Sequence, residues 1–220
     1  MSGRLVVITG TGTGIGKTHC AEALVLAWSR TKGRIAGLKP VESGVSDGVE
    51  SDAARLAAVS SFHVKPFGVS FTPAISPHLA AREAGLPIDL IRLAAQIAAA
   101  RDLADGLVLE LPGGLFTPLS DTVLNADWAA TLAPDLLLVV APDRLGVLHD
   151  ALACVRAANA MGLAVGGFVL VHPGVADTST GRNEPELVRL GVPVLASLRR
   201  APPADLCHAP EFARLISRMD

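Results

Sequence analysis

A glycine-rich segment near the start of the chain constrains the fold more than any other feature. It lies directly after the apolar run 5–9 and directly before an Ala/Leu-rich stretch of helical period, and reads Gly10-Thr11-Gly12-Thr13-Gly14-Ile15-Gly16-Lys17-Thr18. Backbone N–H groups of such a loop converge on phosphate oxygens, and the N-terminus of the following helix adds partial positive charge. The closing lysine suits the outer phosphates, and the closing hydroxyl suits Mg²⁺. The segment therefore predicts a nucleotide-phosphate loop between a strand and a helix.

The spacing within this loop favours a mononucleotide over a dinucleotide. Thr11 stands where the common pattern G-x-x-x-x-G-K-[ST] has its first glycine, but the closing Gly16-Lys17-Thr18 is intact. The dinucleotide pattern G-x-G-x-x-G fails, because Ile15 and Lys17 stand where its last glycine would be. The second predicted strand also ends in Lys39, whereas a dinucleotide site needs an acid there to hold a ribose.

The rest of the chain alternates short β-branched or Leu-rich runs with longer stretches of helical period. This alternation is typical of a parallel sheet with crossover helices, and strands that are apolar throughout are buried on both faces. We expect strands at 5–9, 34–39, 106–110, 135–141, 164–171 and 192–197, and helices at 17–31, 52–60, 90–103, 126–132, 146–161, 184–190 and near 211–218. The prediction is one α/β domain over residues 1–220, with a mostly parallel, doubly wound sheet flanked by helices. We expect the proline-rich residues 64–77 to form a long irregular connection that covers a site.

The composition excludes several classes of function. Half of the 220 residues are hydrophobic and 18% are charged, with a net charge of −2 and no basic block. Aromatic residues for stacking on bases are few, so we expect no nucleic-acid partner. No apolar stretch approaches the roughly 20 residues that cross a bilayer, and three scattered cysteines suit reduced thiols. These features predict a cytoplasmic protein with a small-molecule ligand and no membrane contact.

Three charged residues outside the loop are candidate catalytic or metal-binding residues because of their positions in the predicted elements. Ligands of open α/β sheets bind at the carboxyl edge, where Lys39 and Glu110 end their predicted strands. Asp52 opens a predicted helix, where it could equally serve as an N-terminal cap. Since Mg²⁺ prefers hard oxygen ligands, Glu110 and Asp52 are candidate metal ligands together with Thr18. For Lys39, a solvated surface charge and a catalytic role both remain open at this point.

Several motifs in one order make the chain similar to dethiobiotin synthetase. They are the phosphate loop, Lys39-Pro40-Val41-x-Ser43-Gly44, Ser51-Asp52, Ser76-Pro77-His78 and Glu110-x-x-Gly113-Gly114-x-x-x-Pro118-Leu119. The resemblance covers most of residues 1–150 and implies a P-loop NTPase fold. It further implies an ATP- and Mg²⁺-dependent ligase of biotin synthesis, which joins CO₂ to 7,8-diaminopelargonic acid through a carbamate and a carbamic-phosphoric anhydride and closes a cyclic urea.

The resemblance also implies a role for each matching residue. Lys17 and Lys39 would neutralise charge on the transferring phosphoryl group and on the carbamate, and Mg²⁺ would be bound by Thr18, Asp52 and Glu110. Nucleotide contacts are implied for Gly14, Ile15, Gly16, Lys17, Thr18, His19, Glu110, Leu111, Pro112 and Gly113. Substrate contacts are implied for Thr13, Lys39 and Ser43, and for Gly146, Val147 and Leu148 in a loop that caps the substrate carboxylate of the neighbouring subunit in a homodimer.

The chain departs from the family's pattern at several positions. Gly14 stands where many relatives carry an acid, Leu111-Pro112 replaces Gly-Ala, His149 replaces an Asn, and Val171-His172 replaces an Asn-Asp pair that would read the adenine. Contacts to Mg²⁺, phosphate and base are therefore expected to differ in detail from those of relatives.

Two alternative functions remain open on the sequence. A regulatory ATPase of the partition type has a similar fold, but typically carries a second lysine early in the phosphate loop, which residues 10–16 lack. Another carboxylate-activating ligase of cofactor synthesis would usually carry a glutaminase domain with a nucleophilic cysteine, for which this chain has neither the length nor the motif.

Overall fold

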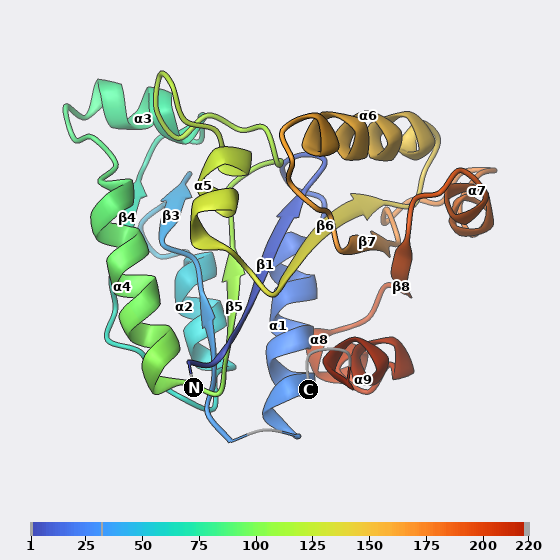
Figure 1. The fold of residues 1–220 in the computed structure, drawn as a ribbon, viewed down its shortest axis with the longest axis horizontal. Helices are drawn as coiled ribbons and strands as arrows, with labels where there is room; N and C mark the ends of the chain where they lie inside the picture. The colour runs from blue at the N-terminus through green and yellow to red at the C-terminus, as the bar shows by residue number, and fades with distance from the viewer. Residues whose placement is uncertain (1, 32, 218–220) are drawn as a thin grey trace.

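The sheet at the centre of the molecule consists of six parallel strands in the order β2-β5-β1-β6-β7-β8 (Figure 1). This computed structural model describes residues 2–31 and 33–217. The strands are β1 (Arg4–Gly10), β2 (Ile35–Leu38), β5 (Gly106–Glu110), β6 (Leu136–Pro142), β7 (Gly167–Val171) and β8 (Val194–Leu198). A separate parallel pair is formed by β3 (Val41–Ser43) and β4 (Val69–Phe71). The doubly wound parallel sheet predicted from the sequence is thus confirmed.

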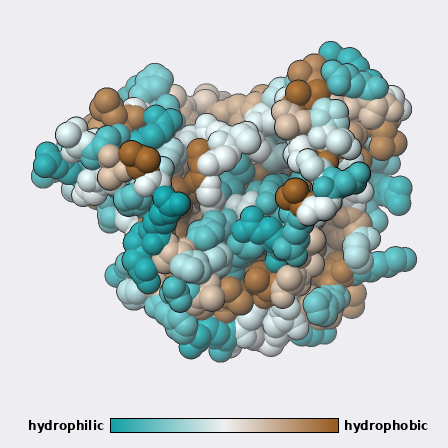
Figure 2. Space-filling view, turned by 180° about the vertical axis from the view of Figure 1, so that it is seen from behind, coloured by the Kyte–Doolittle hydropathy of each residue, from teal (hydrophilic) through white to brown (hydrophobic). Residues whose placement is uncertain are grey.

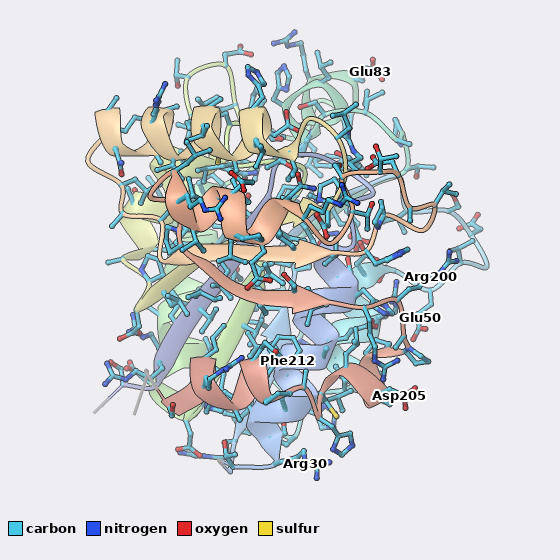
Figure 3. The ribbon with its side chains drawn as sticks, turned by 90° about the vertical axis from the view of Figure 1, so that its right-hand side faces the viewer. Arg30, Glu50, Glu83, Arg200, Asp205 and Phe212 are labelled. Carbon is cyan, nitrogen blue, oxygen red and sulfur yellow. The ribbon has the colours of Figure 1, made fainter. Side chains whose placement is uncertain are left out.

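Side chains of alternate residues in the central strands pack into two apolar cores, one on each face of the sheet. Along β1, Leu5 and Val7 belong to one core, whereas Val6 and Ile8 belong to the other, as the two-residue period of a strand requires. The first core is completed by α4 (Leu90–Leu103), α5 (Asn125–Leu132), α6 (Val147–Ala160) and α7 (Asn183–Arg189). The second is completed by α1 (Lys17–Ser29), α2 (Asp52–Ala58), α8 (Pro203–Leu206) and α9 (Pro210–Ser217), with the fully buried Phe212 of α9 directed inward (Figure 3).

The observed elements correct several predicted boundaries. The first helix ends at Ser29, two residues before the predicted end, and the backbone N–H groups of Arg30 and Thr31 close the last turn on Ala27 and Trp28. Strand β7 begins at Gly167 and not at residue 164, because its pairing with β6 starts at Leu138. The other predicted strands and helices differ from the observed ones by at most two residues at either end.

The connection 64–77 is less irregular than predicted. Its residues Val69–Phe71 form β4, which pairs with β3 because alternate apolar side chains can pack there against the short helix α3 (Pro77–Glu83). Strands β3 and β4 and helices α3 and α8 were not predicted from the sequence. The last part of the connection, Ala74–Pro77, lines the main cavity, so the connection borders the candidate site through these residues.

The state of the cysteines and the lengths of the apolar stretches were also predicted from the sequence. Cys20, Cys154 and Cys207 are buried free thiols, and burial raises the pKa of the first to about 12 and of the second to about 11. In the described part of the chain, no helix combines the length and the apolar character needed to cross a membrane.

Candidate active site

The register of three neighbouring strands brings the charged candidates together at the carboxyl edge of the sheet. Ile8 of β1 pairs with Glu110, the last residue of β5, and Leu38 of β2 pairs with Leu109. Lys39 follows Leu38 and therefore reaches the level of Glu110, while the phosphate loop follows β1 on the other side of β5. The chain leaves β1 toward β2 and leaves β5 toward β6, so this edge is also the switch point at which α/β sheets bind ligands.

The phosphate loop is held in a conformation that depends on its glycines. Gly16, the N-terminal cap residue of α1, has φ of 95°, a left-handed conformation that L side chains rarely adopt. A Cβ at Gly10 would lie 2.6 Å from Ile15 Cδ1 and 3.0 Å from the carbonyl oxygen of Val140, so this glycine, one residue early for the common pattern, is required by packing against β6. The ammonium of Lys17 donates to the carbonyl of Gly12 at 2.8 Å and so lies over the loop.

Two carboxylates and two ammonium groups form a compact charged cluster beside the loop. Lys39 Nζ donates to Glu110 Oε1 at 2.9 Å and also contacts Asp52 Oδ2. The hydroxyl of Thr18 donates to the same oxygen of Glu110 at 3.0 Å. Because Glu110 is 1% exposed, its charge could not persist there without such partners.

The cluster shifts the pKa values of its members in different directions. Burial lowers the pKa of Lys17 and raises that of Glu110, in spite of the opposite charges nearby. Burial would also lower the pKa of Lys39, but the carboxylates of Glu110 and Asp52 outweigh it and raise the pKa overall. For Asp52, burial is likewise outweighed, here by Lys39, then Thr18 and then Arg55, so its pKa is lowered. Lys39 and Asp52 therefore form a charged pair at neutral pH.

The position of Asp52 is fixed by contacts that the sequence analysis did not identify. The buried carboxylate of Glu42 accepts the backbone N–H groups of Asp52, at 2.8 Å, and of Ala53, and thereby caps the start of α2. Arg55, one turn further along α2, makes a bidentate pair with Glu22 of α1 at 2.9 and 2.7 Å. The local signal for the first contact was an acid within the short segment that forms β3. The Glu22–Arg55 pair joins residues too distant in sequence to be foreseen.

A cavity of about 1130 Å³ contains most of the predicted site residues. Figure 2 shows the molecule from behind. Two lobes project at the upper left and upper right, and the surface between them carries both hydrophilic and hydrophobic residues. The predicted residues that line the cavity are Thr13, Gly14, Gly16, Lys17, Thr18, His19, Lys39, Ser43, Asp52, Glu110, Pro112 and Gly113.

Five predicted site residues do not line this cavity. Ile15 and Leu111 pack into the two cores. Gly146, Val147 and Leu148 lie at the start of α6, where Gly146 is the cap residue and is exposed while Val147 is fully buried. The following turns of α6 line the cavity instead, through His149, Asp150, Ala153, Cys154 and Ala157. Helical spacing could have placed these residues on one face, but not opposite the phosphate loop.

The residues present fit a bound Mg²⁺. Glu110 Oε2 is buried and has no hydrogen-bond partner among the described residues, and it belongs to the carboxylate that already contacts Thr18. With Asp52, these groups supply hard oxygen ligands of the kind that Mg²⁺ takes together with water and phosphate. Within residues 2–31 and 33–217, no group of three or more His, Cys, Asp or Glu side chains could hold a metal ion. A site here would thus depend on the Thr18 hydroxyl and on the nucleotide.

A family model and several curated relatives match most of the chain. A family model described as an AAA domain matches residues 4–205. The ATP-dependent dethiobiotin synthetase BioD of Rhodopirellula baltica is 35% identical over 218 residues, which cover 89% of this chain and 84% of the relative. The protein of the same name from Anaeromyxobacter dehalogenans is 39% identical over 219 residues, covering 96% of this chain and 93% of the relative.

Among solved structures, the septum site-determining protein MinD of Pyrococcus horikoshii, complexed with Mg-ADP, has a TM-score of 0.57 and 18% identity, with 99% of this chain and 96% of that chain covered. That likeness is one of fold. The identity to the curated relatives extends over most of both chains, and on these grounds the chain belongs to the dethiobiotin synthetase family.

Proposed function

We propose that this protein is an ATP- and Mg²⁺-dependent dethiobiotin synthetase, which uses CO₂ to close a cyclic urea on 7,8-diaminopelargonic acid. The observation that carries the proposal is the placement of Lys39, Glu110 and Asp52 beside a phosphate loop, in a chain that belongs to this family. In the reaction, one substrate amine attacks CO₂ to give a carbamate, a carbamate oxygen takes the γ-phosphoryl group, and the second amine displaces phosphate.

The phosphate loop binds the nucleotide. Its backbone N–H groups and the N-terminus of α1 face the β- and γ-phosphates, where they offset negative charge in a preorganised geometry. Lys17 moves from the carbonyl of Gly12 to the outer phosphate oxygens. Burial lowers the pKa of this lysine, and phosphate oxygens favour its charged form, so the nucleotide supplies the partner that the buried ammonium needs.

Lys39 acts on the group that receives phosphate. Its ammonium is held between Glu110 and Asp52, Lys39 lines the cavity, and its raised pKa keeps it charged. A cation there stabilises the carbamate oxygen as it attacks phosphorus, and such preorganised charge is the main source of rate in phosphoryl transfer. Thr18, Asp52 and Glu110 would hold Mg²⁺, which would neutralise charge on the phosphate oxygens.

The diamine occupies the part of the cavity beyond the phosphates. Thr13 at the tip of the loop and Ser43 at the end of β3 both line this space, and the Ser43 hydroxyl is oriented by a 2.7 Å hydrogen bond that it donates to the carbonyl of Ile75. The homodimer, the contact of Gly146, Val147 and Leu148 with a neighbouring subunit's substrate, and the cytoplasmic location remain predictions.

The proposed function is tested by phosphate release from ATP in the presence of Mg²⁺ and bicarbonate, with and without 7,8-diaminopelargonic acid. We expect release that depends on the diamine. A regulatory ATPase would instead hydrolyse ATP without the diamine and respond to a protein or DNA partner, and that result would refute the proposal.

A further inference from the structure

A serine and a histidine form a hydrogen-bonded pair at the edge of the main cavity. Ser76 Oγ lies 2.9 Å from His78 Nδ1. Ser76 is the cap residue of α3 and lines the cavity, and His78 is the second residue of that helix. Both side chains are partly accessible, so the pair connects the cavity with solvent.

The Ser76 hydroxyl does not have the usual role of a serine at a helix start. The side chains of Ser51 and Asp89, which precede α2 and α4, accept backbone N–H groups of their helices at 3.1 and 2.9 Å. Within the described structure, Ser76 makes no such capping bond. Its hydroxyl is directed to the imidazole instead, so helix capping does not explain its orientation.

The pair lies close to the residues assigned to the diamine. The carbonyl of Ile75, adjacent to Ser76, accepts the Ser43 hydroxyl, and Ser43, Ile75 and Ser76 line one cavity with Lys39. The acids that line this cavity from the sheet and α2, Glu110 and Asp52, are already engaged by Lys39. They are therefore poorly suited to accept a further proton from substrate.

The chemistry of the proposed function requires a proton acceptor. When an amine nitrogen forms a bond to the carbon of CO₂, its lone pair becomes the new C–N bond and a C=O electron pair moves to oxygen. The nitrogen then carries positive charge, and its N–H bond must break to leave a neutral nitrogen in the carbamate. A positioned base that takes this proton typically accelerates such a step by about 10²- to 10⁴-fold.

We infer that Ser76 and His78 form a proton relay for the amine that attacks CO₂, an inference that rests on the proposed function. The Ser76 oxygen accepts the amine proton and passes its own proton to His78 Nδ1. His78 carries its first proton on Nε2, becomes an imidazolium, and returns the second proton to solvent. Ser76 contacts the amine and transfers its proton, but forms no covalent bond to substrate. His78 does not contact the amine and receives the proton from Ser76.

Charged groups on the elements around the relay are paired with partners other than the imidazole or directed away from it. On α3 itself, Arg82 pairs with Asp121 of a facing loop and Glu83 points outward (Figure 3). Strand β3 carries Glu42, whose carboxylate is bound by the backbone of α2, and β4 carries no titratable side chain. An imidazole changes charge between about pH 5 and 8, so the relay predicts an acid limb in the rate profile in that range.

The test compares His78→Asn, His78→Ala and Ser76→Ala by steady-state kinetics across pH, with saturating ATP, Mg²⁺ and bicarbonate and with the diamine concentration varied up to saturation. Asparagine keeps an acceptor for the Ser76 hydroxyl but cannot take its proton. We expect kcat to fall about a hundredfold in all three variants, with little change in the KM for the diamine and with loss of the acid limb. Ser76→Thr, which keeps the hydroxyl, should retain the limb and most of the rate.

A stability control separates the relay from a structural role. Asp89→Ala removes a true helix cap and should lower the thermal midpoint without changing kcat, whereas Ser76→Ala should lower kcat without changing the midpoint, because its hydroxyl caps nothing. If His78→Asn does not fold, the Ser76 variants still decide the question.

Two results would overturn the relay. One is an acid limb and a kcat in folded His78→Asn and Ser76→Ala that match those of the unaltered protein. The other is a limb that persists in these variants but disappears in His149→Asn, which would make the cavity's α6 histidine the base. Absence of diamine-dependent turnover in the unaltered protein would instead refute the proposed function.

Discussion

Lys39 is the residue on which most of the proposed chemistry depends. It is held by two carboxylates, and we assign it to charge that develops as the carbamate oxygen attacks phosphorus. If so, Lys39→Met should lower kcat about 10²- to 10³-fold while changing the KM for the diamine little, because interactions made only in the transition state appear in kcat. Steady-state kinetics, with circular dichroism as a check on folding, measures both constants.

The matched control for this prediction is Lys65→Met. Lys65 is exposed in the connection that follows α2 and does not line the main cavity, so its loss should leave both constants unchanged. A folded Lys39→Met protein with normal kcat and a raised KM would show that Lys39 only binds the ground state.

The unpartnered oxygen of Glu110 leads to a prediction about Mg²⁺. Glu110→Gln and Asp52→Asn each remove one formal charge from the proposed ligand set, so the Mg²⁺ concentration for half-maximal turnover should rise at least about tenfold in each. Nucleotide binding without Mg²⁺ should change less. A Mg²⁺ titration of turnover checks the first point, and calorimetry with ATP the second.

Glu50→Gln serves as the control for charge alone. Its side chain is exposed at the edge of the molecule (Figure 3), and the variant should keep the Mg²⁺ dependence of the unaltered protein. If Glu110→Gln and Asp52→Asn also keep it, these acids hold Lys39 and cap α2 without binding metal.

The site residues that could be predicted from the sequence are those that belong to short local sequence motifs. The phosphate loop combines glycines and a lysine directly after an apolar strand, all in one short segment. Glu110 ends an apolar run that predicts a buried strand, so its position at the carboxyl edge of the sheet could be predicted as well. The Glu22–Arg55 pair joins two helices and depends on their packing angle. The turns of α6 opposite the loop were missed for the same reason, because nothing local to His149 indicates what it faces.

At the scale of elements, the contact between β5 and α1 depends on the absence of a side chain. A Cβ at Gly106 would lie 2.5 Å from Cη2 of Trp28, whose large ring is 1% exposed and cannot move into solvent. Gly106→Ala should therefore destabilise the protein by about 1–3 kcal/mol through overpacking, measured by the shift in the urea unfolding midpoint at constant slope.

A double-mutant cycle tests the cause of that loss. In a Trp28→Phe background the smaller ring leaves room for the added methyl group, so Gly106→Ala should cost less there than in the unaltered protein. Equal costs in the two backgrounds would mean that the Trp28 contact is not the source of the destabilisation.

Elements with strong periodicity were predictable, and short ones stabilised by tertiary contacts were not. Helix α4 and strand β5 match their predicted bounds in full, because each is a clear periodic or apolar run. Strands β3 and β4 have three residues each and exist only as partners of one another. Helix α3 begins at Pro77 in a proline-rich segment, where composition favours a loop and only the packing of Ala80 and Ala81 on Phe71 indicates a helix.

At the scale of the whole molecule, Asp135 connects three elements of the fold. Its carboxylate accepts the backbone N–H of Leu5 in β1 at 2.8 Å, and it pairs with Arg4 of β1 and with Arg101 of α4. Burial would raise its pKa, but these hydrogen bonds and charges outweigh that effect and lower it below the ordinary value of 3.8. Its contribution to stability is therefore fully present above that value and is lost as the pH falls through the lower pKa of the folded state.

Asp135→Asn should accordingly lower the free energy of unfolding at pH 7 by about 1–2 kcal/mol. The difference from the unaltered protein should shrink below about pH 4. Urea unfolding at several pH values measures it. Asp121→Asn, which disrupts a pair with Arg82 whose side chains are 73% and 59% exposed, should change stability by less than about 0.5 kcal/mol at either pH. A pH-independent loss in Asp135→Asn would show that shape, and not charge, matters at this site.

The most direct test of the account follows the carbon that the proposed reaction adds. The protein is supplied with ATP, Mg²⁺, 7,8-diaminopelargonic acid and isotopically labelled bicarbonate, and the products are analysed by mass spectrometry alongside ADP. The account predicts that the label appears as the carbonyl carbon of a cyclic urea, with one labelled product for each ADP formed, and that Lys39→Met lowers both together. ADP formed without labelled product, at an unchanged rate when the diamine is left out, would contradict it.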